Sequence, residues 1–410
     1  MRYLAFIVIL LAGNISFSRT IIVGENESVN SIRRAIEIAN AHDTILVRKG
    51  NYREGSLVIA KPLVILGIDL PVLNGEKKYE ILTIGANDVT VKGIHFLNSG
   101  YSAMNDFASI KVIDADRVSI LNNRITGAYF AIHISNSSHA LVRGNTIMGN
   151  PRSEQLTGNG IHFWKSSHAY IDSNHISGHR DGIYFEFVTF SFIRKNLSEN
   201  NIRYGLHFMF SNDDHYIGNT FKSNGAGVAV MYSKKVRMEL NRFEHNWGAS
   251  SYGLLLKDIA DSDIHNNLFL KNTSGIHMEG TSRITVHHNT FKENGWAMRV
   301  QASCNDNEFF YNNYLGNSFD VGTNGSLVMN KFYANYWDKY EGYDINKDGI
   351  GDIPYRPVSM YSMIVEQNPN SLILLRSFTV SLLDKAEKAI PSLTPENLFD
   401  DKPLMKSLTL

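Results

Sequence analysis

The chain has 410 residues, a length that ordinarily makes two or three domains unless repeats extend a single one. Its 40 basic and 40 acidic residues balance, so no global field favours nucleic acid, and we expect no nucleic-acid partner. Its single cysteine, Cys304, excludes an internal disulfide framework and a zinc site built from several thiolates.

Residues 1–18 have the layout of a secretory signal peptide. A charge at Arg2 precedes a short apolar run over residues 4–12, and small residues follow near Ser16 and Ser18. The apolar run is short for a membrane span. We therefore expect export to a bacterial periplasm with cleavage near Ser18, and a retained anchor is the alternative.

Residues 19–335 are predicted to form one repeat domain that opens with a cap. Between Ser31 and Asn40, apolar residues recur at positions i, i+3, i+4 and i+7, which is the pattern of an amphipathic helix. A strand is expected at residues 44–47, shortly after this helix. Such a helix would cover the apolar end of the first repeat.

A short phrase, Asn-x-aromatic, returns about every 22 residues through the middle of the chain, with Ile in the aromatic place of the first three copies and Ser198 in that of the fourth. It begins at Asn123, Asn145, Asn174, Asn196, Asn219, Asn241, Asn267, Asn289, Asn307 and Asn330. A period of this length with a strand-like core predicts an all-β solenoid, a right-handed parallel β-helix. A β-propeller would need a longer period of about 40 residues or more.

The stacking of coils leads to two further predictions about the interior. The asparagine side chains should stack at a bend and bond to one another along the axis, because Asn tolerates left-handed backbone angles. The aromatic residues two positions later should stack into one buried ladder, which would consist of Phe221, Phe243, Phe269, Phe291, Phe309 and Phe332.

A second phrase of the form Gly-Ile-His-Phe runs in step with the first, as at residues 205–208. Alternation places its second and fourth residues in the core and its third on the outer surface. His207, Met209 and, one coil later, Met231 would then approach one another. Imidazole with thioether suits Cu(I), so these three are candidate copper ligands. A histidine ladder stabilised by stacking, or a surface for a partner protein, is the alternative.

The parallel β-helix often carries polysaccharide lyases, hydrolases and epimerases, and such sites need clustered carboxylates. On the outward strip, Glu186 and Glu279 lie about four coils apart, or roughly 19 Å at the usual strand spacing. That separation is too large for a paired-acid mechanism. Asp213 and Asp214 are closer together but are typical of a solvated turn. We therefore predict that the chain is not an enzyme, and a carbohydrate-binding or carbohydrate-active protein is the alternative.

Residues 336–368 are rich in Trp, Asp and Gly and contain a candidate calcium loop. The loop has glycine at position 6 and offers oxygen ligands at positions 1, 3, 5 and 9, which are Asp344, Asn346, Asp348 and Asp352. The glutamate expected at position 12 is missing, because Tyr355 stands there. We predict a structural calcium ion that ties the C-terminal segment to the last coil, and a simple turn is the alternative.

Residues 369–410 are predicted to be a helix followed by an extended tail. The helical pattern covers residues 372–390. Arg376 and Asp384 interrupt its apolar run, which argues against a transmembrane helix. The tail that follows contains Pro391, Pro395 and Pro403.

Several local phrases resemble the NosD family of nitrous oxide reductase maturation proteins. They include Gly-Asn-Tyr-Arg-Glu at residues 50–54, Asn-Tyr-Trp-Asp at residues 335–338 and the tail over residues 400–406. The resemblance spans nearly the whole mature chain. Lys402, which separates an aspartate from Pro403, is a minor departure from the ending expected of the family.

The resemblance implies a periplasmic subunit that stands on an ABC transporter, made of the ATPase NosF and the permease NosY. With the copper chaperone NosL it would help to assemble the copper–sulfide site of apo nitrous oxide reductase, without being an enzyme itself. It would hold a copper ion transiently, and the segment from Pro369 onward would be its membrane-side anchor. The resemblance implies no particular ligand set, so His207, Met209 and Met231 rest on the sequence pattern.

Overall fold

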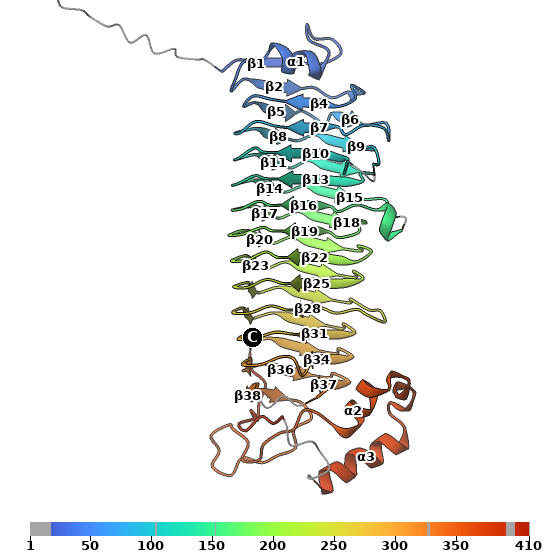
Figure 1. The fold of residues 1–410 in the computed structure, drawn as a ribbon, viewed down its shortest axis with the longest axis vertical. Helices are drawn as coiled ribbons and strands as arrows, with labels where there is room; N and C mark the ends of the chain where they lie inside the picture. Colours follow the sequence, from blue (N-terminus) through green and yellow to red (C-terminus); the bar gives the residue numbers. More distant parts are fainter. Residues whose placement is uncertain (1–17, 103–104, 152, 326–328, 391–397, 410) are drawn as a thin grey trace, which may run out of the picture.

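The computed structural model describes residues 18–102, 105–151, 153–325, 329–390 and 398–409. Most of these residues form a tall column of stacked coils, in which three parallel sheets run along the axis (Figure 1). The prediction of an all-β parallel β-helix is confirmed. The predicted signal peptide, apart from Ser18, lies outside the described residues, as do Pro391 and Pro395 of the tail.

The three sheets, named A, B and C, have 14, 13 and 12 strands. Sheet A consists of β1 (Thr20–Val23), β2 (Thr44–Val47), β5 (Val64–Gly67), β8 (Thr90–Lys92), β11 (Ser119–Leu121), β14 (Leu141–Arg143), β17 (Tyr170–Asp172), β20 (Phe192–Arg194), β23 (His215–Ile217), β26 (Arg237–Glu239), β29 (Asp263–His265), β32 (Thr285–His287), β35 (Glu308–Phe310) and β38 (Lys331–Tyr333). Sheet B consists of β3 (Asn51–Tyr52), β6 (Val72–Asn74), β9 (His95–Leu97), β12 (Arg124–Thr126), β15 (Thr146–Met148), β18 (His175–Ser177), β21 (Leu197–Glu199), β24 (Thr220–Lys222), β27 (Arg242–Glu244), β30 (Leu268–Leu270), β33 (Thr290–Lys292), β36 (Asn313–Leu315) and β39 (Tyr336–Trp337). Sheet C consists of β4 (Leu57–Ile59), β7 (Leu82–Ile84), β10 (Ala108–Ile113), β13 (Phe130–Ser135), β16 (Ile161–Trp164), β19 (Ile183–Glu186), β22 (Tyr204–Met209), β25 (Ala226–Met231), β28 (Leu254–Lys257), β31 (Ser274–Glu279), β34 (Trp296–Val300) and β37 (Phe319–Gly322).

The predicted cap helix is present as α1 (Ile32–Ile38), and it lies at one end of the column (Figure 1). Its N-cap is Ser31, whose hydroxyl accepts a hydrogen bond from the backbone N–H of Arg34. Ile32 and Ala35 on its apolar face are buried against the first coil. The helix therefore shields the apolar end of the core from water, as a cap on a solenoid must.

The opposite end of the column carries a helical extension (Figure 1). It contains α2 (Met360–Gln367), a 3-10 turn (Pro369–Leu374) and α3 (Phe378–Ala389). The helix predicted within residues 372–390 corresponds to α3, whereas α2 was not anticipated. No helix in the described part of the chain is both long and apolar enough to cross a membrane.

The core runs along the column because side chains alternate between its inside and its surface. On β16, Ile161 and Phe163 are fully buried, while His162 and Trp164 reach the outer face. The same alternation repeats on neighbouring strands, so one continuous apolar core extends from Ile21 to beyond Trp337. The outer faces of the sheets are thus free to carry other chemistry.

From Asn123 onward, a buried asparagine ladder binds each coil to the next, at the bend before sheet B. Asn219 is typical: its backbone N–H and its side-chain Nδ2 both donate to Oδ1 of Asn241, each at 3.0 Å. Nδ2 also donates to the backbone oxygen of Ile193 at 2.9 Å. The members are Asn123, Asn145, Asn174, Asn196, Asn219, Asn241, Asn267, Asn289, Asn312 and Asn335. A second ladder of the same kind consists of Asn201, Asn224, Asn246, Asn272, Asn294 and Asn317.

The last two positions predicted for the ladder are wrong. Asn307 and Asn330 lie at a different bend, before sheet A, where the Oδ1 of Asn307 accepts from the backbone N–H of Ile284 at 2.9 Å. The ladder continues instead through Asn312 and Asn335. The error arose because an Asn-x-Phe phrase can serve at either bend, since both need a side-chain amide to satisfy backbone groups.

The predicted single aromatic ladder is corrected for the same reason. Phe309 and Phe332 stack on each other in sheet A, at a ring distance of 4.2 Å. The ladder of sheet B ends instead with Tyr314 and Trp337, whose rings are 3.9 Å apart. Its full membership is Phe221, Phe243, Phe269, Phe291, Tyr314 and Trp337.

The asparagine ladder ends on a carboxylate from the C-terminal tail. The backbone N–H and the Nδ2 of Asn335 both donate to Oδ2 of Asp400 at 3.0 Å. The indole N–H of Trp337 donates to the same oxygen at 3.0 Å. Asp400 is fully buried, and this burial raises the pKa of its carboxyl. The tail thus supplies the acceptor that a further coil would otherwise provide.

Replacing Asn219 with alanine should strongly destabilise the solenoid. The change removes the acceptor for two donors of Asn196, at 3.0 and 2.9 Å, and the donor to Ile193. Because these groups stay buried without partners, we expect a loss of about 4 kcal/mol in the free energy of unfolding. Urea denaturation measures it, with Asn370→Ala, at an exposed position of the helical extension, as the control. Equal midpoints for the two variants would contradict the structural role of the ladder.

Candidate functional site

The outer face of sheet C carries two columns of side chains in strand register. The first, called the histidine column, contains Lys111, His133, His162, Tyr184, His207, Ala229, Leu255, His277 and Arg299. The second, called the methionine column, contains Ser135, Trp164, Glu186, Met209, Met231, Lys257 and Glu279. This is the outward strip on which the sequence placed the candidate copper ligands.

Tilted and edge-to-face contacts between rings dominate the upper half of the histidine column. His133, His162, Tyr184 and His207 follow one another with ring distances of 4.7, 4.8 and 5.0 Å. Tyr204 covers His207 from the same strand, at 4.8 Å. His207 is consequently only 4% exposed. A continuous ladder of rings is therefore present here, although its contacts are tilted or edge-to-face and not stacked as the alternative reading of the sequence expected.

The candidate copper ligands share one face of sheet C but differ in accessibility. Met209 and Met231 lie opposite each other on the adjacent strands β22 and β25. The hydroxyl of Tyr184 lies 3.5 Å from the sulfur of Met209. His207 stands two residues before Met209, and its Nδ1 lies 3.6 Å from a carboxylate oxygen of the buried Asp181. The structure thus pairs the two methionines and leaves the imidazole beneath its aromatic neighbours.

Exposed aromatic rings border the methionine column. Phe187, Phe210 and Tyr232 each follow a strand of sheet C and stack with ring distances of 5.2 and 5.1 Å. They are 45%, 39% and 43% exposed. Together with Met209 and Met231 they form the aromatic–methionine patch. A contiguous apolar surface of this kind is typical of a docking site for another protein.

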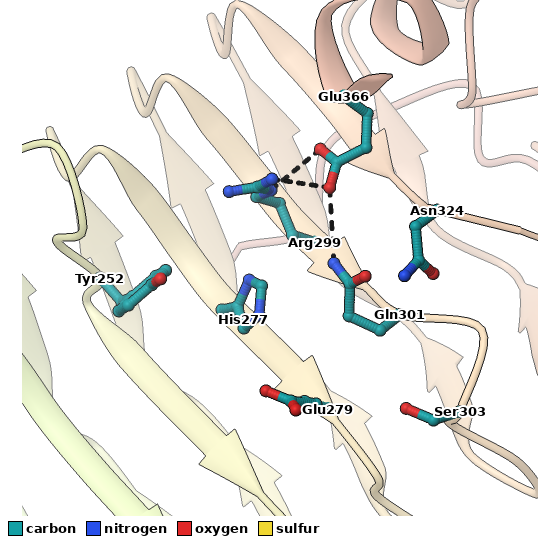
Figure 2. A pocket seen from close by; sticks show the side chains of 8 residues that line it. All are labelled: Tyr252, His277, Glu279, Arg299, Gln301, Ser303, Asn324 and Glu366. Carbon is teal, nitrogen blue, oxygen red and sulfur yellow. Dashed lines mark hydrogen bonds and ion pairs between the residues drawn. The ribbon is translucent and has the colours of Figure 1, made fainter. Parts of the chain in front are cut away.

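The lower end of sheet C opens into a polar pocket of about 500 Å³ (Figure 2). It is lined by Tyr252, His277, Glu279, Arg299, Gln301, Ser303, Asn324 and Glu366. Glu366 comes from α2 and forms a two-point ion pair with Arg299, with N–O distances of 3.1 and 2.6 Å (Figure 2). The pair fastens α2 to the sheet, since both groups are largely shielded from water.

The charges of the pocket are mostly engaged with one another. Glu279 lies 3.3 Å from the ammonium group of Lys257, and Glu366 is held by Arg299. Burial, and then the positive charge of Arg299, lower the pKa of His277 to about 4, so its imidazole is neutral near pH 7. Figure 2 shows Gln301 and the Arg299 side chain between the two acids. This arrangement can bind a polar group but lacks the facing carboxylates of a glycosidase.

The four predicted calcium ligands gather in one exposed loop. Asp344 accepts hydrogen bonds from the backbone N–H of Asp348 and of Gly349, at 3.2 and 2.9 Å. Asp352 accepts from the N–H of Ile345 at 2.7 Å, and Nδ2 of Asn346 donates to Asp348 at 3.0 Å. The loop is closed by its own polar groups. It also pairs with the C-terminal tail, because the N–H of Gly351 donates to the Pro403 carbonyl at 2.8 Å.

Comparison with known proteins identifies the family of this β-helix. A family model described as "Periplasmic copper-binding protein (NosD)" matches residues 151–348. The chain is also 30% identical, over 87% of its length and 85% of the relative, to "Probable ABC transporter binding protein NosD" of Stutzerimonas stutzeri. The chain belongs to the NosD family. The protein of the same name in Pseudomonas aeruginosa is 27% identical to this NosD chain, over 86% of each.

Solved structures similar to this NosD chain share its fold at low sequence identity. The catalytic unit of a GH87 α-1,3-glucanase from Streptomyces thermodiastaticus has a TM-score of 0.63 and 13% identity, covering 80% of this chain and 70% of that one. The Dettilon tailspike protein has a TM-score of 0.55 and 12% identity, covering 70% and 64%. At such identities the likeness concerns the β-helix alone.

The ion pair of Arg299 with Glu366 was not predicted from the sequence. Glu366 lies 67 residues further on, in a helix that was not anticipated. The Ser359 N-cap, which accepts from the N–H of Ser362, was the available local signal for α2. Asp400 was noted only as part of the tail, because a carboxylate that ends a ladder has no local sequence signature.

Proposed function

We propose that this chain is a periplasmic accessory subunit that docks on an ABC transporter and supports copper-site assembly in nitrous oxide reductase. On this proposal it binds and presents copper or the apo-reductase, and it catalyses no reaction itself. The observation that carries the proposal is the aromatic–methionine patch, which combines soft sulfur donors with an exposed docking surface. Membership of a copper-binding family whose relatives are named as transporter-binding proteins supports it.

The copper cargo would be Cu(I), held transiently by Met209 and Met231 with His207. Met209 and Met231 are paired residues on adjacent strands, whose backbones lie about 5 Å apart. Their two sulfur atoms can therefore reach a shared ion. Tyr184 would have to release the sulfur of Met209, and the ring of His207 would have to turn out from beneath Tyr204. Binding would therefore be coupled to a local rearrangement, which suits a site that must also give up its ion.

The helical extension would face the transporter and the membrane. Its exposed apolar side chains are unusual for a soluble surface and include Ile373, which is 88% exposed, and Phe378, which is 82% exposed. Such residues suit contact with the permease NosY, with the ATPase NosF on the far side of the membrane. The chaperone NosL and apo nitrous oxide reductase would then meet the outer face of sheet C. The ion pair of Arg299 with Glu366 would connect the two regions.

A carbohydrate-binding or carbohydrate-active role remains the second candidate from the sequence. The polar pocket beside Tyr252 is the feature that could accept a sugar. Of its two acids, however, Glu366 is held in an ion pair and Glu279 lies close to a lysine. Turnover of uronic-acid polymers that is abolished by Glu279→Gln would favour this role over copper handling.

Loss of the two sulfurs should weaken Cu(I) binding. We expect the double variant with Met209→Leu and Met231→Leu to bind Cu(I) at least about tenfold more weakly, because leucine keeps the packing but removes both soft donors. Anaerobic competition with a chromogenic Cu(I) chelator measures the affinity. Met148→Leu, at a methionine that is 45% exposed on sheet B, is the matched control. Equal affinities for the wild type and the double variant would exclude this copper site.

We further propose that the loop over residues 344–352 binds a structural calcium ion. Millimolar calcium should then stabilise the wild type by about 1–2 kcal/mol, as expected for a site of millimolar to submillimolar affinity. Asp348→Asn should abolish the shift, whereas Asp384→Asn, at an exposed position of α3, should retain it. Thermal unfolding with calcium and with a chelator tests this. A wild-type melting temperature that ignores calcium would leave the loop as a simple turn.

A further inference from the structure

The outer face of sheet A carries a cluster of histidines and acids that the proposed function does not use. Glu239, His265 and His287 occupy equivalent positions on the successive strands β26, β29 and β32. Asp263 lies two residues before His265 and points from the same face of β29. Glu239 and His287 are 48 residues apart in the sequence. The register that the asparagine ladder imposes nevertheless brings these side chains together.

Three of these side chains converge on one point. Asp263 lies between the two imidazoles, with one oxygen 3.1 Å from Nδ1 of His265 and the other 3.0 Å from Nε2 of His287. The two rings stack at 5.0 Å and are nearly parallel. Within the described ranges, this is the one group of three His, Cys, Asp or Glu side chains whose ligand atoms lie within 4.8 Å of one another.

The distances between the carboxylate of Asp263 and the two imidazole nitrogens suit a metal ion. Ligands that bind zinc tetrahedrally at about 2.0–2.1 Å lie about 3.3 Å from one another. The two carboxylate–imidazole distances are already within a few tenths of an ångström of that value. Small side-chain rotations, rather than movement of the strands, would close the site around an ion.

Neighbouring groups orient both imidazoles as metal ligands require. Glu239 lies 2.8 Å from Nε2 of His265, so the proton is held on that nitrogen and Nδ1 is left facing Asp263. On His287, Nδ1 lies 2.9 Å from Nδ1 of His288, and Nε2 is left facing the same carboxylate. A carboxylate or a second imidazole behind each ligand is typical of metal sites.

An ion-pair cluster without metal is the competing explanation. A proton shared between Asp263 and Nδ1 of His265, which lie 3.1 Å apart, could hold this pair together. A salt bridge alone, however, does not require two imidazoles to face one carboxylate with their outer nitrogens fixed. The cluster is also accessible, since the Asp263 side chain is 38% exposed and that of His287 is 23% exposed. An ion could therefore enter and displace the proton.

We propose that Asp263, His265 and His287 form a binding site for a divalent transition-metal ion of the Zn²⁺ and Cu²⁺ class. Two imidazoles with one carboxylate suit these borderline ions, and three protein ligands leave a coordination position open for water or a donor from another molecule. The site lies on a different sheet from the Met209–Met231 pair, whose thioethers suit Cu(I) instead. Its existence does not depend on the function proposed above.

The test is calorimetric titration of the metal-stripped protein with ZnCl₂ and, separately, with CuCl₂. We expect one equivalent of either ion to bind, with Cu²⁺ the tighter, and at least about a tenfold loss of affinity in Asp263→Asn and in His287→Gln. His175→Gln removes an exposed histidine that pairs with a single acid, Glu199, on sheet B, and it should bind as the wild type does. Circular dichroism confirms that each variant is folded.

A second measurement separates this site from the one on sheet C. The variant with Met209→Leu and Met231→Leu should keep the wild-type affinity for Zn²⁺, and bound Cu²⁺ should show nitrogen hyperfine coupling that decreases in His287→Gln. The assignment is wrong if the wild type binds neither ion, or if Asp263→Asn and His287→Gln both bind as tightly as the wild type. It is also wrong if the methionine variant is the one that loses Zn²⁺.

Discussion

The structure depends on how backbone donors at the bends of each coil are satisfied. A sheet pairs its own backbone groups, but the bends between sheets would leave N–H groups buried without partners. The asparagine side chains solve this, because Oδ1 of Asn241 accepts from both the N–H and the Nδ2 of Asn219 in the preceding coil. Each such contact forms only if two coils are in register. The ladder therefore fixes the alignment of the coils from Asn123 onward and ends where Asp400 supplies the final acceptor.

Because the register is fixed, residues at equivalent positions of successive coils line up in columns on the outer faces of the sheets. On sheet C it places Met209 beside Met231 and stacks exposed aromatic rings next to them, and this is the face that we propose to bind a soft metal and a protein partner. On sheet A it gathers Asp263, His265 and His287 around one point. The apolar interior takes no part in either arrangement. A β-helix thus separates the residues that hold the fold from those that can vary for function.

The sequence predicted the features that repeat and missed those that do not. Period and alternation were sufficient for the parallel coils, for the outward strip and for α1. The predicted ladder positions were wrong at Asn307 and Asn330, because the same Asn-x-Phe phrase can occur at either bend. The ion pair of Arg299 with Glu366 joins residues far apart in the chain, so no local sequence pattern predicts it. The cluster around Asp263 was not predicted because Glu239 and His265 are 26 residues apart, whereas His265 and His287 are 22 apart, so a constant period does not align the three positions.

The role proposed for the face of sheet C is tested most directly in cells that express nitrous oxide reductase. The reductase is purified from cells that lack this chain and carry either the wild-type gene or the variant with Met209→Leu and Met231→Leu, and its copper content is measured. Copper handling by this face predicts a reductase depleted of copper in the variant strain and in the strain without the gene. A full complement of copper in the reductase from both of those strains would contradict it.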